Sequence, residues 1–335
     1  MKSNEYKLGV SYFGNRFLKH AKKDLADIAE CCSYVVHTFS ERDLFFHKSA
    51  MENIFSETRK RGMQVWVDPW GVGGVFGGES FSKFLLDHRR AWQFLSTGEA
   101  VKAACLNNPD FRAFVKEWIN NVKDLGGQVI LWDEPHVYIT LELELGKIYT
   151  CTCPICEAKF MKKYAEKMPF QRNRAVQDFR IESMRDFLNE VMAHAKKLKL
   201  INALTIYAYK GNEEYDRIWD MAGSLEHVDI FGCDPYWHWH GKHDPEDHVG
   251  YFASKVVNTC TKYQKEPHLW IQAMKFPRGA EKTIMQAVEA AADREVTNIA
   301  AWSYDGGELL DNVYSEDSRN VWKTVKKAYI KLLRK

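Results

Sequence analysis

The stretch Val129–His136 reads VILWDEPH, in which an apolar run ends in two adjacent acids, Asp133 and Glu134. Similar apolar runs with polar and aromatic endings recur along the chain: WVDPW (66–70), IYAYKG (206–211), FGCDPYW (231–237), WIQAMK (270–275) and AWSYDGG (301–307). Such near-continuous apolar runs are typical of buried parallel strands. Functional groups that gather at the carboxyl ends of successive strands predict a (β/α)8 barrel with its site at that rim.

Strand and helix signals alternate from one end of the chain to the other. The expected strands are Lys7–Phe13, Tyr34–Phe39, Gln64–Asp68, Gln128–Asp133, Leu204–Tyr209, Val228–Cys233, His268–Met274 and Asn298–Tyr304. Helical patterns between them include Leu18–Cys32, Lys48–Arg61, Phe111–Leu125, Ala175–Leu198, Asp247–Tyr263, Glu281–Arg294 and Asp317–Leu333. Eight β/α units with right-handed crossovers close into a parallel barrel with the helices outside. We therefore expect one barrel domain over 1–335, with loop insertions at 71–108 and 136–156.

The composition narrows the function classes. The 335 residues carry 47 basic and 45 acidic side chains, a net charge of +2, and no basic stretch dense enough for a nucleic-acid interface. The Lys-rich end VKKAYIKLLRK has helical spacing and is interpreted as a solvated last helix. The N-terminal MKSNEYKLGV lacks an apolar signal segment, and no apolar run approaches the ~20 residues that span a bilayer. We expect a cytoplasmic protein without a membrane partner, whose eight cysteines are thiols or metal ligands.

Four of the cysteines fall in the two insertions. Cys151, Cys153 and Cys156 form a C-x-C-x-x-C motif ahead of a helix, and Cys105 lies upstream in the other long loop. Four thiolates from two neighbouring loops would form a closed tetrahedral zinc site and crosslink loops that have no core of their own. The spacing alone leaves a second interpretation open, in which these are reduced thiols in a turn and an apolar filler.

Three stretches resemble the family 42 glycoside hydrolases, the β-galactosidase-like barrels of the large retaining glycosidase clan. They are AACLNNPDFRAF (103–114), VILWDEPHVY (129–138) and YTCTCPICEAKFMKKY (149–164). The resemblance implies that Cys105, Cys151, Cys153 and Cys156 bind a structural Zn²⁺, with no organic cofactor. It covers the region from Cys105 to Phe160 well, and the remainder of the chain only as architecture.

The resemblance also assigns roles to two acids. The clan places its acid/base after an Asn at the end of the fourth strand, so Glu134 takes over that role and Asp133 occupies the Asn position. Glycosidic cleavage requires such a protonated carboxyl beside the leaving oxygen. The neighbouring Trp132 and Pro135 provide the apolar surroundings that favour a protonated carboxyl.

The second catalytic group departs from the clan pattern. Gln272 occupies the place of the nucleophilic Glu at the end of the seventh strand, and an amide cannot form the glycosyl-enzyme ester. An inverting enzyme could instead use a base from another strand end, for which we select Asp234 and Asp305, with Asp68 also available. A tyrosine-based or substrate-assisted route and a loss of hydrolysis are the alternatives.

Further residues near the strand ends are expected to line the sugar subsite: Asp68, Trp70, Asp133, His136, Tyr207, Tyr236, Trp237, Gln272, Lys275 and Trp302. Tryptophan rings stack on the apolar C–H faces of sugars. Lys275 would suit an acidic sugar, or is simply a solvated loop charge. Similarly, the DPYW segment around Tyr236 could be only a turn with a capping Asp.

The sequence therefore predicts a glycosidase, an O-glycosyl hydrolase of carbohydrate metabolism that cleaves a small oligosaccharide or glycoside by carboxylate acid/base catalysis. Two rivals stay open. One is a non-catalytic carbohydrate-binding barrel, which Gln272 favours and Glu134 opposes. The other is a metal-dependent lyase or isomerase built on Asp234 and the histidines of the following loop, of which His240 and His243 lie outside the residues described below. Aromatic loops at the rim would also permit a homo-oligomer that closes the site.

Overall fold

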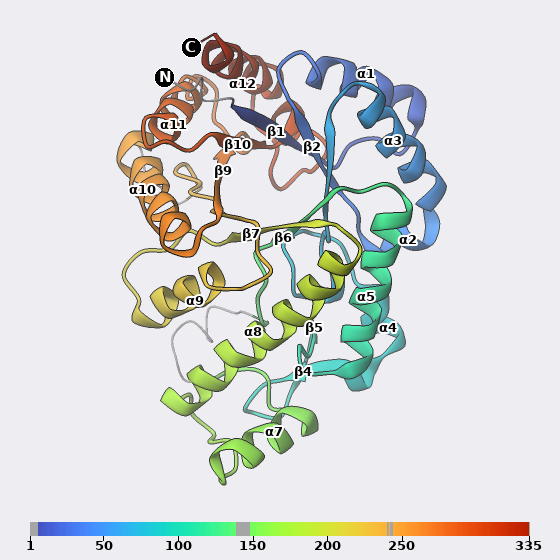
Figure 1. Cartoon of the computed structure of the whole chain (residues 1–335), viewed down its shortest axis with the longest axis vertical. Coiled ribbons are helices and arrows are strands. Elements are labelled where there is room, and N and C mark those ends of the chain that lie inside the picture. Colours follow the sequence, from blue (N-terminus) through green and yellow to red (C-terminus); the bar gives the residue numbers. More distant parts are fainter. Residues whose placement is uncertain (1–5, 139–147, 240, 242–243, 335) are drawn as a thin grey trace.

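The computed structural model describes residues 6–138, 148–239, 241 and 244–334. Eight parallel strands close into a barrel in the order β1-β2-β3-β6-β7-β8-β9-β10 (Figure 1). Their bounds are β1 Lys7–Tyr12, β2 Tyr34–Thr38, β3 Gln64–Asp68, β6 Val129–Asp133, β7 Ile201–Ile206, β8 Ile230–Cys233, β9 Glu266–Gln272 and β10 Asn298–Trp302. The prediction of a (β/α)8 barrel is confirmed.

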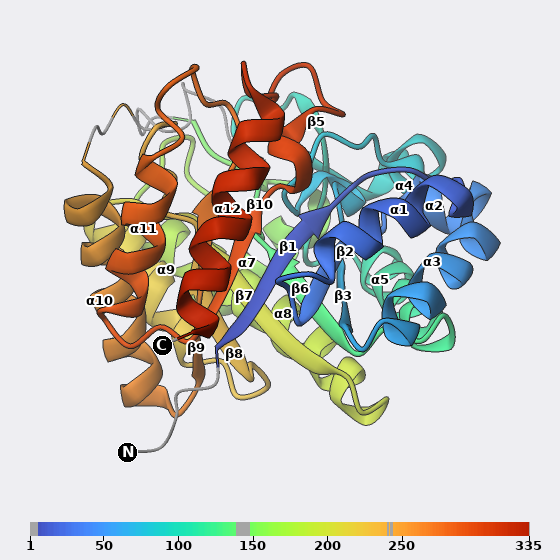
Figure 2. The same ribbon diagram turned by 90° about the horizontal axis from the view of Figure 1, so that it is seen from above.

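Helices surround the barrel, and α10, α11 and α12 lie side by side along one flank (Figure 2). The α-helices are α1 Leu18–Ile28, α2 Glu41–Phe46, α3 Lys48–Lys60, α4 Lys83–Asp87, α5 Pro109–Asp124, α7 Pro154–Tyr164, α8 Arg174–Lys197, α9 Glu213–Gly223, α10 Pro245–Tyr263, α11 Thr283–Ala292 and α12 Ser318–Leu333. Long helices such as α5, α10 and α12 bury one apolar face, as amphipathic surface helices do. None of the helices in the described ranges combines the length and apolar character that crossing a membrane requires.

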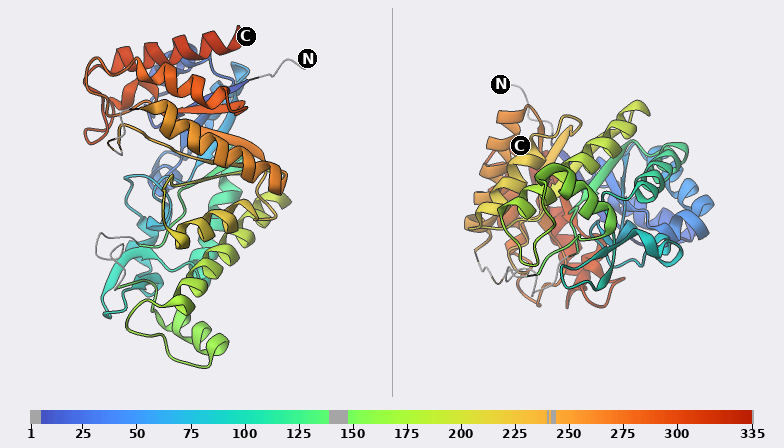
Figure 3. Two further views of the ribbon diagram at one scale, coloured as in Figure 1. Left: turned by 90° about the vertical axis from the view of Figure 1, so that its left-hand side faces the viewer. Right: turned by 90° about the horizontal axis from the view of Figure 1, so that it is seen from below.

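The insertion at 71–108 is more ordered than a glycine-rich loop. It contains η1 (Val72–Gly74), α4, η2 (Arg89–Ala91) and an antiparallel hairpin of β4 (Trp92–Phe94) and β5 (Ala100–Ala104). The hairpin and α7 lie at the end of the molecule opposite α12 (Figures 1 and 3). Asn108 then starts α5 by accepting hydrogen bonds from the backbone N–H groups of Asp110 and Phe111.

The barrel interior is packed with side chains up to its carboxyl end. Its buried cluster consists of Tyr34, Val36, Trp66, Val129, Leu131, Ala203, Ile230, Trp270 and Ala300. Tyr236 and Trp302 are partly buried and pack onto this cluster. Since side chains alternate along a strand, Asp68 lies on the same face as Trp66, and Asp133 on the same face as Leu131. These two acids therefore belong to the last inward-facing layer of the barrel.

Candidate active site

Four carboxyl groups gather at the carboxyl rim, and we call Asp68, Asp133, Glu134 and Asp234 the carboxyl ring. Asp68 and Asp133 end β3 and β6, which are neighbours in the barrel. Gly77 packs against two of these carboxyl groups. A Cβ atom at this glycine would lie 2.3 Å from Asp133 Oδ2 and 3.6 Å from Glu134 Oε2. Asp133 and Glu134 therefore face the same side of the rim although they are adjacent in sequence.

A change of backbone direction after β6 makes this arrangement possible. Glu134 has φ 37°, a left-handed conformation that turns its side chain out of the strand alternation. Its N–H donates to Thr205 O at 3.0 Å, which anchors the turn on β7. The His136 ring lies at hydrogen-bond distance, Nδ1 to Glu134 O 2.7 Å, and fixes the same turn. The structure therefore places His136 beside Glu134, as a support for its backbone.

Asp234 lies directly against Glu134. Their side chains are within hydrogen-bonding reach of each other, and Asp234 Oδ1 also accepts from Ala208 N at 3.2 Å. Asp234 is buried, whereas Glu134 is partly exposed. This proximity favours the protonated form of Asp234, because adjacent negative charges destabilise each other.

Among the residues that the structure describes, the largest charges that act on Asp68, Asp133 and Asp234 are all negative. Burial, followed by the charges of Asp133, Glu134 and Glu79, raises the pKa of Asp68 well above its ordinary value. Burial, followed by Glu134 and Glu79, raises the pKa of Asp133 in the same way. The pKa of Asp234 is raised by burial and then by Glu134. Burial and mutual repulsion therefore favour the protonated forms of these three carboxyl groups.

An aromatic floor lies beside the ring. The rings of Trp70 and Trp302 are stacked with centroids 5.7 Å apart and planes 14° apart. Phe13 contacts both, with centroids 6.0 Å from Trp70 and 5.3 Å from Trp302. Burial raises the pKa of Tyr236, and the next causes are the charges of Asp234 and Asp133. The predicted residues Trp70, Tyr236 and Trp302 are thus brought together with the acids.

Gln272 has a different role from the predicted subsite residue. Its side chain is 0% exposed, and Oε1 accepts from the backbone N–H groups of His238 at 2.9 Å and Trp239 at 3.2 Å. Its Nε2 donates to Met274 O at 3.0 Å. The amide therefore anchors the loop after β8 to the end of β9. The interpretation of Gln272 as a sugar contact is corrected, because its polar atoms are engaged by the protein.

Other predicted contacts spread out around the rim. Trp237 is also 0% exposed and packs against Phe276, so the expected stacking on a sugar is corrected. Its neighbour Trp239 is 46% exposed, and Lys275 Nζ lies 4.2 Å from the centre of that ring. Tyr207 is exposed just beyond β7. Indole rings bury readily, and the sequence pattern does not show which of two neighbouring tryptophans faces inward.

Asp305 does not join the carboxyl ring. It lies in η3 (Tyr304–Gly307) after β10, with φ 50°. Burial and a hydrogen bond with Glu308 raise the pKa of Asp305 to about 6. None of the charges that act on it belongs to the ring; they are Glu308, Arg319 and Asp24. The prediction of Asp305 as a base opposite Glu134 is corrected, because the carboxyl group faces its own 3-10 turn and α12.

The four predicted metal ligands converge, and we call Cys105, Cys151, Cys153 and Cys156 the thiol cluster. All four are buried, and their sulfur atoms lie within 4.8 Å of one another. Cys105 Sγ is 3.5 Å from both Cys153 Sγ and Cys156 Sγ. A tetrahedral ion with Zn–S bonds of about 2.3 Å requires S–S separations of ~3.8 Å. The donor set and its geometry therefore fit a closed zinc site.

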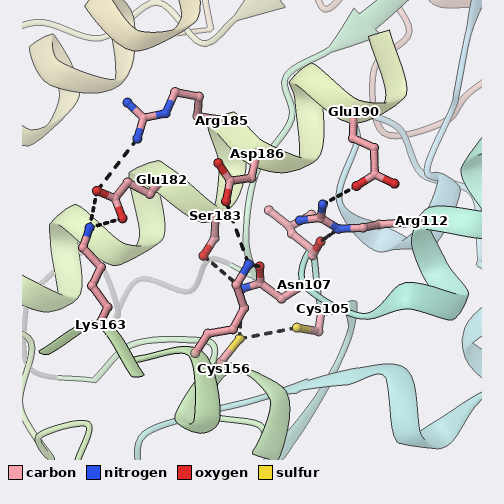
Figure 4. Close-up of polar contacts among 12 residues, drawn as sticks. Cys105, Asn107, Arg112, Cys156, Lys163, Glu182, Ser183, Arg185, Asp186 and Glu190 are labelled. Atoms are coloured by element: carbon pink, nitrogen blue, oxygen red, sulfur yellow. Dashed lines mark hydrogen bonds and ion pairs between the residues drawn. The ribbon is translucent and has the colours of Figure 1, made fainter. Parts of the chain in front are cut away.

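Asn107 connects the thiol cluster with the helices around it (Figure 4). Its Nδ2 donates to Cys156 Sγ at 3.3 Å and to Ser183 Oγ on α8 at 2.9 Å. Lys159 on α7 donates to Asn107 Oδ1 at 2.7 Å. This contact orients the amide so that its N–H group points at the sulfur, as supporting hydrogen bonds around metal ligands do.

A surface cavity of about 550 Å³ lies outside the barrel, beside Asn107 and between α5, α7 and α8. Its charged lining is already paired, since Glu190 accepts a hydrogen bond from Arg112 (Figure 4) and another from Lys116. It contains none of the strand-end residues. We therefore place the chemistry at the rim, where the carboxyl groups and the aromatic floor meet.

Sequence reasoning missed three contributors to the rim. Phe13 follows β1 and completes the aromatic floor. Gly77 lies against the carboxyl groups, and Glu79 adds a further negative charge to Asp68 and Asp133. The run GVGGVFGGE contained the signal, because a glycine allows backbone to approach a crowded site closely.

No protein-family model matches this chain, and no curated protein matches it. Among solved structures, it is similar to a β-galactosidase from the Antarctic haloarchaeon Halorubrum lacusprofundi, with a TM-score of 0.70 and 12% identity over 97% of this chain and 58% of that one. A β-galactosidase from the psychrophilic Marinomonas ef1 has a TM-score of 0.72 and 10% identity over 97% and 59%.

The catalytic domain of a β-amylase from Paenibacillus polymyxa is similar over 97% of this chain and 99% of its own, with a TM-score of 0.64 and 10% identity. This chain spans about three fifths of the length of the two β-galactosidases. At these identities the similarity shows a shared fold, so the chemistry has to be argued from the residues at the rim.

Proposed function

We propose that this barrel is a glycoside hydrolase whose general acid is Glu134. The observation that carries the proposal is a partly exposed carboxyl group at the rim, in contact with a buried acid and beside a stacked aromatic floor. Protonation of a leaving oxygen requires such an acid, and the floor offers a flat apolar surface to a sugar ring. The glycosidases with the same fold support this proposal by analogy.

The roles of the other acids are revised within the proposal. Asp234 is buried beside Glu134 and its pKa is raised, so it acts as a positioning residue and not as the base. Asp68 and Asp133 are the remaining ring carboxylates, and one of them activates the water. An inverting reaction is favoured, because Gln272 at the end of β9 offers no nucleophile.

We also propose that the thiol cluster holds a structural Zn²⁺. Cys105 follows β5, and the other three cysteines surround the start of α7, so a bound ion would tie the hairpin to that helix. Hydrogen bonds within the cluster lower the pKa of the Cys153 thiol but raise those of Cys105 and Cys156, so the proposal rests on the convergence of the four sulfur atoms. A bound zinc ion would crosslink the hairpin and α7 and would take no part in catalysis, since four protein ligands leave no position for substrate.

The experiment that tests the hydrolase is a screen of 4-nitrophenyl glycosides with the full chain and with Glu134→Gln. We expect turnover of at least one glycoside and a loss of roughly 10²–10⁴-fold in kcat for the variant. Glu166→Gln, an exposed change on the other side of the thiol cluster, is the matched control and should retain full activity. A barrel that binds sugars without cleaving them would show no turnover with any member of the panel.

A further inference from the structure

Among the described residues, the main charges that act on Asp68 and Asp133 of the carboxyl ring include no positive one, and the proposed role of Glu134 does not explain this. The charges that act on Asp68 are those of Asp133, Glu134 and Glu79, and those on Asp133 are Glu134 and Glu79. All of them are negative. Buried carboxylates elsewhere in proteins are paired with a cation or hydrogen-bonded, because an isolated buried charge is strongly destabilising.

Asp68 provides a second, independent observation. It is 1% exposed, and its Oδ1 atom has no hydrogen-bond partner among the described residues. The strand alternation directs this side chain to the inner face of the barrel, towards the other ring acids. A buried acceptor in this position is complementary to a donor that arrives with a ligand, and a positively charged donor would also offset the ring's charge.

We propose that this donor is the ammonium group of an amino sugar, so that the glycoside bound at the rim carries a free amine. The inference rests on the proposed function and specifies its substrate class. An ammonium group has three donors and no acceptor, which matches carboxylates that can only accept. Asp68 binds the ammonium group through its unpartnered Oδ1 atom.

A metal ion is the other cation to consider, and the geometry disfavours it. Within the described ranges, the thiol cluster is the one group of three or more His, Cys, Asp or Glu side chains close enough to hold an ion. The ring carboxylates do not meet that condition. An ammonium group on a sugar ring donates hydrogen bonds to carboxylates that lie further apart than the ligands of one metal ion.

The aromatic floor selects a ring-shaped ligand over a linear amine. Buried Trp70 stacks within 14° of parallel against Trp302, which is only partly buried, so the apolar surface open to a ligand is that of the Trp302 ring. The exposed cation nearest in sequence to the end of β9, Lys275, lies over Trp239 and is not among the charges that act on Asp68 or Asp133. This arrangement does not support the acidic sugar that the sequence suggested for Lys275.

The test is isothermal titration calorimetry of the full chain with D-glucosamine and D-galactosamine, with the neutral D-glucose and D-galactose, and with D-glucuronate. We expect at least one amino sugar to bind tenfold or more tightly than its neutral parent. Asp68→Asn should reduce that ratio at least threefold, and the exposed Asp311→Asn should leave it unchanged. If Asp68→Asn does not fold, Asp133→Asn, which also removes a ring charge, replaces it.

Equal affinity for the neutral sugar, tighter binding of glucuronate, no binding of any sugar, or a preference that survives both substitutions would overturn the inference. The monosaccharides are not cleaved, so these outcomes are independent of turnover. Conversely, an amino-sugar preference in a protein that cleaves no aryl glycoside, amino or neutral, would support the inference and reject the hydrolase.

Discussion

The carboxyl ring and the thiol cluster each bring four ionisable side chains together from distant parts of the sequence, yet their surroundings differ. The sulfur atoms of the thiol cluster lie within 4.8 Å of one another, all four are buried, and Asn107 supports one of them. The ring is wider, two of its members, Asp133 and Glu134, are partly exposed, and stacked indoles lie beside it. A closed set of ligands stabilises a fold, whereas an open and unneutralised set is available for a substrate.

The largest effect on stability is expected from the thiol cluster. Cys156→Ser removes one thiolate, so we expect loss of bound zinc and a decrease of more than about 3 kcal/mol in the free energy of unfolding. Metal analysis and thermal unfolding measure both. Cys260→Ser, at a buried but isolated cysteine, is the control and should retain the metal. Full metal content in Cys156→Ser would contradict the proposed ligand set.

In the carboxyl ring, Asp234→Asn separates activity from stability. The amide still accepts from Ala208 N, but it no longer places an ionisable group beside Glu134, so we expect hydrolysis to fall about 10–100-fold. Folding raises the pKa of Asp234, so the folded state binds this proton more tightly than the unfolded state does. The stability of the wild-type protein therefore falls as pH rises above the pKa that Asp234 has in the unfolded chain. The variant should therefore unfold at a higher temperature than wild type at pH 7. A lower unfolding temperature would contradict the raised pKa of Asp234.

Gln272→Glu tests whether a glutamate at position 272 can act as the nucleophile that the clan uses at the end of its seventh strand. A carboxylate cannot donate to Met274 O, and the site is fully buried, so we expect a stability loss of about 1–3 kcal/mol and no gain in hydrolysis. Denaturant unfolding and the glycoside screen measure the two effects, with the exposed Gln171→Glu as control. Faster hydrolysis with formation of a covalent glycosyl-enzyme would show that Gln272 does occupy a nucleophile position.

The smallest effect is expected at Asp305, outside the ring. Its pKa is raised from 3.8 to about 6, so the folded state holds the proton more tightly and stability falls as pH rises through this interval. Asp305→Asn should flatten that part of the pH–stability curve. Because the side chain is partly exposed, the change should be below about 1 kcal/mol. Hydrolysis should be unaffected, and a tenfold loss would return Asp305 to the active site.

Much of the architecture could be predicted from the sequence because buried parallel strands are short apolar runs. The bounds of β3 are Gln64–Asp68 in both the prediction and the structure. Strand β7 was expected at Leu204–Tyr209 but spans Ile201–Ile206. The exposed tyrosines after it have high strand propensity, whereas Asn202, which is buried and donates to Met192 O and His227 O, looks like a turn residue.

The site was harder to predict, because side-chain direction at a strand end depends on tertiary contacts. The convergence of the four cysteines followed from a spaced motif and a resemblance, and the structure brings them together. The contact between Asp234 and Glu134 depends on a left-handed turn that no propensity indicates at a glutamate. The burial of Gln272 likewise depends on a loop from another strand, which the sequence of β9 does not contain.

The most direct test of the central claim is a leaving-group series. The measurement is kcat/KM of wild type and Glu134→Gln for aryl glycosides of one sugar, from 2,4-dinitrophenyl to 4-methylphenyl. If Glu134 protonates the leaving oxygen, the variant should lose little with dinitrophenolate, which departs without a proton, and roughly 10²–10⁴-fold with methylphenol. An equal loss across the whole series would contradict the account, because it would assign Glu134 to binding or folding.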